Sequence, residues 1–386
     1  MRSFASRALK TLVSGAAVCL FAAASPAAAQ IKIGLIASAT GPGAAMGIPY
    51  RNTLALLPDT IGGEDVKYIF FDDASDPTQG VRGAQRLITE DKVDAIIGSN
   101  SMPVSLAIVE VTSAAKTPFL VVSPTSFSGE AFHWSFPLPQ PMDLMIKGVI
   151  ADMKAKNART VGYVGFSDSW GDVVLQSLQK QVGDAGLEIV AEERYARPDT
   201  SVMSQALRLF SVKPDVVLVG ASSSAAVLPE ASLRDMGYRG QIYQTHAAVT
   251  ADFIRLGGKS VEGAIAPTGP LTLAASLSDD NPIKAKATRL KDRYEEKYGE
   301  NTFNPFVGYV WDAGEMLSET VPTALKEGEP GTSEFRVALR DALEQITGLV
   351  GTQGVYSMTP QDHNGLDDRA RVMIQVRDGR WQLLDE

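Results

Sequence analysis

The chain has 386 residues, 45% of them hydrophobic and 21% charged, and its net charge is −9. This length suits two or three domains, and the composition is that of a globular protein with a sizeable core. It excludes an intrinsically disordered chain, a collagen, a polytopic membrane protein and a small disulfide-stapled fold. The acidic balance also disfavours a nucleic-acid-binding protein, which must neutralise phosphates.

The first 29 residues have the pattern of a secretory signal peptide. Three basic residues among the first ten precede an apolar run at 12–24, and Ala27-Ala28-Ala29 offers a cleavage site. The apolar run is too short to span a bilayer comfortably. The sole cysteine, Cys19, lies within it, so the mature chain can form neither a disulfide nor a zinc–thiolate site. We therefore expect a periplasmic protein that has lost residues 1–29.

Beyond the leader, short apolar strands alternate with amphipathic helices, the order typical of parallel sheets with crossover helices. The first run of elements has predicted strands at 31–37, 66–71, 93–97 and 119–122, with helices ending near 57, at 77–90 and from 103 onward. The pattern then starts again, with strands at 160–164, 187–192, 216–219 and 241–244 and helices ending near 182, at 201–210 and at 225–236.

The last part of the chain adds helices and a hairpin. Helices are predicted at 282–298, 309–325 and 333–346, and strands at 371–376 and 381–384. The two strands flank Asp378-Gly379, a dipeptide that favours a tight antiparallel hairpin. Two successive runs of alternating elements predict an α/β protein with two doubly wound parallel-sheet lobes.

Five stretches along the chain carry a family pattern, which is weak in any one of them and strong in the series. They are Ile31-Lys32-Ile33-Gly34-Leu35 with Thr40-Gly41-Pro42, Asp72-Asp73 with Asp76-Pro77, Lys92 to Gly98, Thr117-Pro118-Phe119 with Ser123-Pro124, and Gly351 to Tyr356 with Asp362-His363. The series resembles the periplasmic leucine/isoleucine/valine-binding protein family. These are type I solute-binding proteins that deliver small molecules to the membrane permease of an ABC importer.

The resemblance implies two lobes joined by three crossovers, with the ligand in the cleft between them. It implies an N-terminal lobe of residues 30–144 plus 273–353 and a C-terminal lobe of residues 145–272 plus 354–386. The crossings are expected near 143–146, 270–273 and 352–355. The resemblance also implies a monomer that needs no cofactor or metal and is not an enzyme.

Candidate ligand-binding residues follow the predicted strands, because open parallel sheets bind ligands at the carboxyl ends of their strands. Serine, threonine and free helix N-termini there suit a carboxylate, although the same residues can simply cap helices. The resemblance assigns a carboxylate clamp to the first-lobe loops and an aromatic wall to Trp170, whose alternative role is interdomain packing. The candidate residues are Met46, Ser101, Met102, Ser123, Thr125, Ser126, Phe127, Trp170, Ser222, His246 and Phe306.

The sequence departs from the amino-acid binders of that family in one loop. Those proteins place an acidic residue after the fourth strand of the second lobe, where it pairs with the ligand ammonium. Here residues 245–251 contain no carboxylate, and His246 stands in the loop instead. Because burying an uncompensated ammonium is costly, we expect a small organic acid, preferably an aromatic carboxylate. A branched-chain or other amino acid is the alternative, with Asp168 as the substitute carboxylate.

Four other classes fit less well. A serine hydrolase is the remote alternative, since Ser167 follows a strand and precedes a helix, with Asp215, His246 and His363 as later partners. A dinucleotide-binding loop is disfavoured because Pro42 sits where the phosphate turn would form. The three histidines lack metal-ligand spacing. A sensory receptor ectodomain shares the expected fold.

Overall fold

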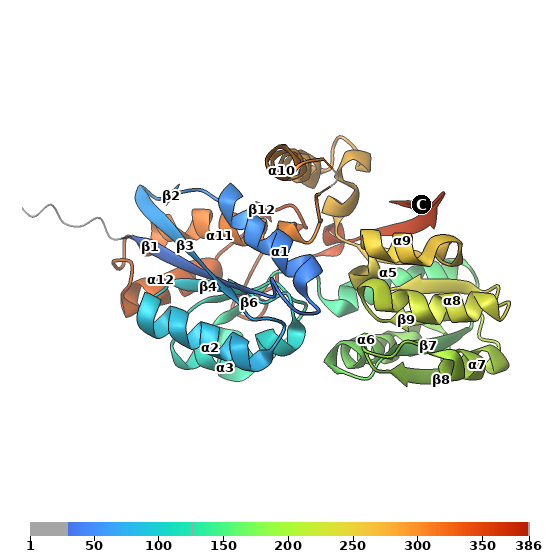
Figure 1. The fold of residues 1–386 in the computed structure, drawn as a ribbon. Helices are drawn as coiled ribbons and strands as arrows, with labels where there is room; N and C mark the ends of the chain where they lie inside the picture. The colour runs from blue at the N-terminus through green and yellow to red at the C-terminus, as the bar shows by residue number, and fades with distance from the viewer. Residues whose placement is uncertain (1–29, 126, 301, 385–386) are drawn as a thin grey trace, which may run out of the picture.

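A computed structural model describes residues 30–125, 127–300 and 302–384, and these form two α/β lobes lying side by side (Figure 1). The predicted signal peptide, Cys19 and Ser126 lie outside the described residues. Within the described ranges, no helix has both the length and the apolar character needed to cross a membrane.

The first lobe is built on a six-stranded sheet in which every pairing except that of β2 with β3 is parallel. Alternate residues of β1 face opposite sides, so that Ile33 packs with one hydrophobic cluster and Ile36 with the other. The strands in spatial order are β2 (Thr60–Ile61), β3 (Glu64–Asp72), β1 (Ile31–Ala37), β4 (Ala95–Gly98), β5 (Phe119–Val121) and β6 (Ser135–Pro137).

Helices cover both faces of this sheet. The pair α2 and α3 covers the face of Ile36, and α1, α10, α11 and α12 pack over the face of Ile33. Asp76 starts α2 by accepting a hydrogen bond from the Gln79 amide, and Pro77 occupies its first turn, where a missing N–H costs nothing. The helices are α1 (Ala44–Thr53), α2 (Pro77–Arg86), α3 (Met102–Ala114), α4 (Gly129–His133), α10 (Pro282–Tyr298), α11 (Val307–Ala324) and α12 (Ser333–Leu343).

The second lobe repeats the arrangement on a seven-stranded sheet. All five residues of β9 are buried, as expected for a central strand covered on both faces. The strands in spatial order are β15 (Arg380–Leu383), β14 (Val372–Arg377), β11 (Ile265–Thr268), β10 (Gln241–Gln244), β9 (Val216–Gly220), β7 (Thr160–Phe166) and β8 (Glu188–Tyr195). The helices are α5 (Met142–Ala155), α6 (Ser169–Ala185), α7 (Met203–Val212), α8 (Val227–Asp235) and α9 (Ala251–Gly257).

The predicted C-terminal hairpin is confirmed. The strands β14 and β15 are antiparallel, and Arg377 pairs with Arg380 across a two-residue turn. Asp378 and Gly379 both have positive φ, at 52° and 65°, which is the geometry that Asp-Gly favours in such turns. Figure 1 shows this hairpin, in red, attached to the second lobe although it ends the chain. The two doubly wound lobes predicted from the sequence are therefore both present.

The chain passes between the lobes three times, and the segments meet around Gln140. Its side-chain amide donates to the carbonyls of Gln353, at 3.1 Å, and Ala370, at 2.9 Å, and its oxygen accepts from Tyr309 at 2.6 Å. Gly269, on the second passage, packs against the same place, since a Cβ there would lie 2.0 Å from Oε1 of Gln353. The Gln140 amide thus ties the first passage to Ala370, at the start of the third, and the second passage packs beside it at Gly269.

Hydrophobic packing shows where each passage falls. Leu138 belongs to the first-lobe core and Met142 to the second-lobe core, and the second passage follows β11 at Gly269. On the third passage Tyr356 still packs in the first-lobe core, and the chain enters the second sheet at Val372. The sequence placed this last crossing near 352–355. The short pair β12 (Leu349–Val350) and β13 (Val355–Tyr356) keeps that segment with the first lobe.

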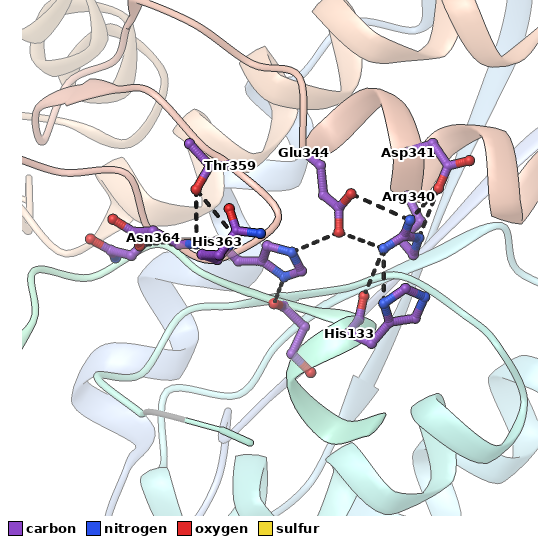
Figure 2. Close-up of polar contacts among 10 residues, drawn as sticks. His133, Arg340, Asp341, Glu344, Thr359, His363 and Asn364 are labelled. Atoms are coloured by element: carbon purple, nitrogen blue, oxygen red, sulfur yellow. Dashed lines mark hydrogen bonds and ion pairs between the residues drawn. The ribbon is translucent and has the colours of Figure 1, made fainter. Parts of the chain in front are cut away.

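A buried polar cluster anchors the segment that leads into the third passage (Figure 2). The ring of His363 stacks between Phe132, at 4.1 Å, and Phe136, at 4.5 Å. Its Nε2 lies 2.9 Å from Oε1 of Glu344, a carboxylate that also accepts from Arg340. These residues come from four segments of the first lobe, so the cluster holds the loop around His363 against α12 and the edge strand β6.

Candidate functional site

The loops at the carboxyl ends of three first-lobe strands are organised by a buried aspartate. Asp73, which follows β3, accepts from the Ser38 hydroxyl and the Ser75 amide at one oxygen, and from the Ser99 hydroxyl at the other. The two hydroxyl contacts are 2.6 Å long, and Asp73 has no exposed surface. This carboxylate therefore holds together the loops after β1, β3 and β4.

Two predicted residues of the carboxylate clamp lie at the start of α3. Ser101 is the N-cap, in an extended conformation, and its hydroxyl does not cap the helix. The amides of a first helical turn lack intrahelical partners, and a helix N-terminus favours an anion. Met102, the first residue of α3, is 6% exposed and packs in the hydrophobic cluster of the second lobe, together with Phe166 and Trp170. The two lobes therefore meet at this point.

The loop after β5 carries the next predicted residues. Ser123 is buried, and its hydroxyl donates to Oγ of Ser105, a residue of α3, at 2.8 Å. The hydroxyl of Thr125 donates to the Ser123 carbonyl at 3.2 Å, so both side chains help to shape the loop. Phe127 is half-buried and packs against the cluster under α2 and α3.

Met46 and Phe306 come from two neighbouring segments of the first lobe. Met46 lies in the first turn of α1, and Phe306 is the N-cap residue of α11, packed against the first-lobe core. Asn304 donates a long hydrogen bond, 3.5 Å, to the Ala45 carbonyl and so connects the two segments. Both side chains are half-buried.

The second-lobe edge presents a wall held at one carbonyl oxygen. The Trp170 indole N–H donates to the Ala221 carbonyl at 3.2 Å, and the Thr245 hydroxyl donates to the same oxygen at 2.7 Å. His246 follows, with its ring edge-to-face on Trp170 at 5.4 Å and 69°. The loops after β7, β9 and β10 are thereby tied together, and Trp170 and His246, both largely buried, are in contact and form the second-lobe wall.

His246 is uncharged at neutral pH. Its side chain is 4% exposed, and burial lowers its pKa from 6.5 to about 4. Its Nδ1 is buried without a hydrogen-bond partner among the described residues. A neutral imidazole offers one donor and one acceptor but carries no charge of its own to balance an ion.

An arginine that sequence reasoning missed occupies the rim of this wall. Arg197 follows β8, lies over the Phe166 ring at 4.2 Å and forms an ion pair with Asp168. Arg197 also donates to the Ser222 hydroxyl at 3.3 Å, so the predicted binding residue Ser222 lies close to Asp168. The other Asp168 oxygen accepts from the amides of Trp170 and Gly171, as an N-cap of α6. In the sequence, the only indication of this role is that Arg197 is a positively charged residue shortly after a strand.

Comparisons with known proteins agree with this architecture. A family model for periplasmic binding proteins matches residues 30–380. The chain belongs to the periplasmic binding protein family. It is 44% identical to an extracellular ligand-binding receptor of Rhodopseudomonas palustris HaA2, whose structure aligns with a TM-score of 0.89 over 92% of this chain and 100% of that one.

The descriptions of two further matches name a ligand. The Leu/Ile/Val-binding protein BraC3 of Rhizobium johnstonii is 26% identical over 339 residues, which cover 83% of this chain and 90% of BraC3. A solute-binding protein of an ABC transporter from R. palustris, solved in complex with benzoate, shares the fold at a TM-score of 0.76 and 17% identity, over 92% of this chain and 95% of that one.

Membership of the periplasmic binding protein family implies a periplasmic protein that binds a small molecule and works with an ABC transporter. The relatives are binding proteins and not enzymes, which removes the hydrolase alternative. The structure separates the proposed triad as well. Asp215 precedes β9 and accepts from the amides of Arg159 and Thr160, at the amino ends of the strands, whereas Ser167 follows the carboxyl end of β7. His363 lies in the first lobe.

Proposed function

We propose that this periplasmic binding protein captures a small aromatic carboxylate between its lobes and presents it to the permease of an ABC importer. The observation that carries the proposal is the uncharged second-lobe wall of Trp170 and His246. A flat apolar indole with a neutral imidazole suits an aromatic ring. Residues 1–29 act as its cleaved leader, and the mature protein works as a monomer.

The first lobe supplies the carboxylate end. The free amides in the first turn of α3, which starts at Met102 after its N-cap Ser101, form the anion clamp, and the loop of Ser123 and Thr125 lies beside them. Helix N-termini and hydroxyl groups stabilise a carboxylate without a full positive charge. In this arrangement Met46, Phe127 and Phe306 border the first-lobe side, and Ser222 the second-lobe side.

An amino-acid ligand needs a counter-charge for its ammonium group. Asp168 is the substitute expected from the sequence, but one of its oxygens caps α6 and the other pairs with Arg197. An ammonium placed beside it would compete with a guanidinium at the same carboxylate. This occupied Asp168 favours a ligand without an amino group.

A branched-chain amino acid is the second candidate, supported by the similarity to BraC3. Calorimetric titration of the mature protein separates the two candidates. Benzoate, 3-phenylpropanoate and cinnamate are titrated in parallel with leucine, isoleucine and valine. Binding of an aromatic acid at about micromolar Kd or tighter, near −8 kcal/mol, supports the proposal. Leucine binding of that strength with no response to any aromatic acid rejects it.

A further inference from the structure

We propose that His246 is a specificity-determining residue that hydrogen-bonds a hydroxyl group on the ring of the ligand. The ligand class would then be hydroxylated aromatic carboxylic acids rather than unsubstituted ones. This inference rests on the proposed function. It adds that the ligand carries a hydroxyl group at the end that faces the second lobe.

The first step is that one ring nitrogen of His246 lacks a hydrogen-bond partner among the described residues. Its Nδ1 is buried without a partner in the described chain, although the side chain is only 4% exposed. Buried polar atoms are nearly always paired, because leaving one unpaired forfeits its hydration. The neighbouring donors Trp170 and Thr245 both direct their hydrogens to the Ala221 carbonyl instead.

The second step is that the residue is held in place and cannot turn freely toward solvent. The ring lies edge-to-face against Trp170, and Trp170 is itself fixed by its hydrogen bond to Ala221. His246 starts a short 3-10 helix, residues 246–248, directly after β10, so its backbone is set by a central strand of the sheet. A preoriented group loses little entropy when it binds a ligand.

The third step is the chemistry of the partner. Burial keeps the imidazole neutral, as its pKa is lowered to about 4. A neutral imidazole pairs well with a hydroxyl, which can donate or accept to match either tautomer. An ammonium would lack a counter-charge here, because the carboxylate of Asp168 is taken by Arg197 and the amides that it caps. A hydroxyl on a ring that packs against Trp170 meets both conditions.

The test compares matched acids that differ only in a ring hydroxyl. Mature wild-type protein is titrated calorimetrically at pH 7 with benzoate and 4-hydroxybenzoate, 3-phenylpropanoate and its 4-hydroxy derivative, and cinnamate and 4-hydroxycinnamate. At least one hydroxylated acid should bind about tenfold or more tightly than its partner, because the site otherwise keeps a buried polar atom unpaired. Equal affinities within every pair overturn the inference.

Three variants separate recognition from packing. His246→Phe keeps a ring against Trp170 but has neither a donor nor an acceptor, so it should remove the preference for the hydroxylated member of each pair. His246→Gln keeps a donor and an acceptor and should retain part of the preference. Trp170→Ala should instead weaken both members of a pair to a similar extent. A hydroxyl preference that survives unchanged in His246→Phe overturns the role of His246.

The titrations also distinguish a failure of the proposed function from a failure of the role assigned to His246. If no aromatic acid binds but an amino acid does, the proposed function falls and this inference with it. If aromatic acids bind but hydroxylated and unsubstituted members are equal, the proposed function stands and only the role of His246 is rejected.

Discussion

A buried glutamate in the second lobe should make the stability of this protein fall as the pH rises. Glu230, on α8, has no exposed surface, and burial raises its pKa from 4.5 to about 8. The Gln244 amide donates to one oxygen at 2.8 Å, but the other has no hydrogen-bond partner within the described parts of the chain. Arg234 lies 3.9 Å away and already donates to the carbonyls of Tyr238 and Gly240, so it compensates the charge only weakly.

The size of the effect follows from proton linkage. Above pH 4.5 Glu230 is ionised in the unfolded chain but stays protonated in the fold until about pH 8, so unfolding releases a proton. Each pH unit in this interval costs about 1.4 kcal/mol, and the full interval amounts to about 5 kcal/mol. Stability contributed by the protonated group is therefore present at acidic pH and lost as the pH rises toward 8.

Glu230→Gln tests this, because the amide keeps a partner for Gln244 but cannot ionise. The free energy of unfolding is measured with urea, by tryptophan fluorescence, at several values from about pH 6.5 to 8. His246 and Asp312 also have shifted pKa values, about 4 and about 6, but both proteins share them, so their contributions cancel in the difference between the variant and wild type. The variant should gain about 2 kcal/mol relative to wild type across it. Parallel curves for the two proteins would refute the reasoning.

Three further outcomes are expected. Trp170→Ala should weaken the true ligand by about 1 to 3 kcal/mol, because the ring is a preoriented aromatic contact; unchanged affinity in calorimetry would leave Trp170 a packing residue. Gly269→Ala should lower the melting temperature, since the new Cβ would lie 2.0 Å from Oε1 of Gln353. Gly183→Ala, on a helix with open space around it, is the matched control and should be neutral or stabilising; equal melting temperatures for the two variants would contradict the tight packing at the crossings. Intact-mass measurement of protein released by osmotic shock should find Gln30 at the N-terminus, and retention of residues 1–29 would reject the predicted cleavage.

The sequence alone determined the two-lobed α/β architecture, because alternating strand and helix periodicity reports which face of each element is buried. The strand predicted at 241–244 matches β10, and Asp378-Gly379 identified the terminal hairpin. These features depend on neighbours within a few residues. Trp170 and His246 were also chosen from the sequence, and the structure brings them into contact; their role toward a ligand stays a prediction.

The tertiary structure decided what depends on distant partners. The strand β6 is three residues long and ends in Pro137, so nothing local announces it, and its pairing with β5 defines it. The side chain of Gln140 joins carbonyls more than 200 residues away in the sequence. Arg197 became part of the site only when the loops after β7, β8 and β9 converged, because hydrogen bonds and ion pairs depend on distances in space that periodicity does not encode.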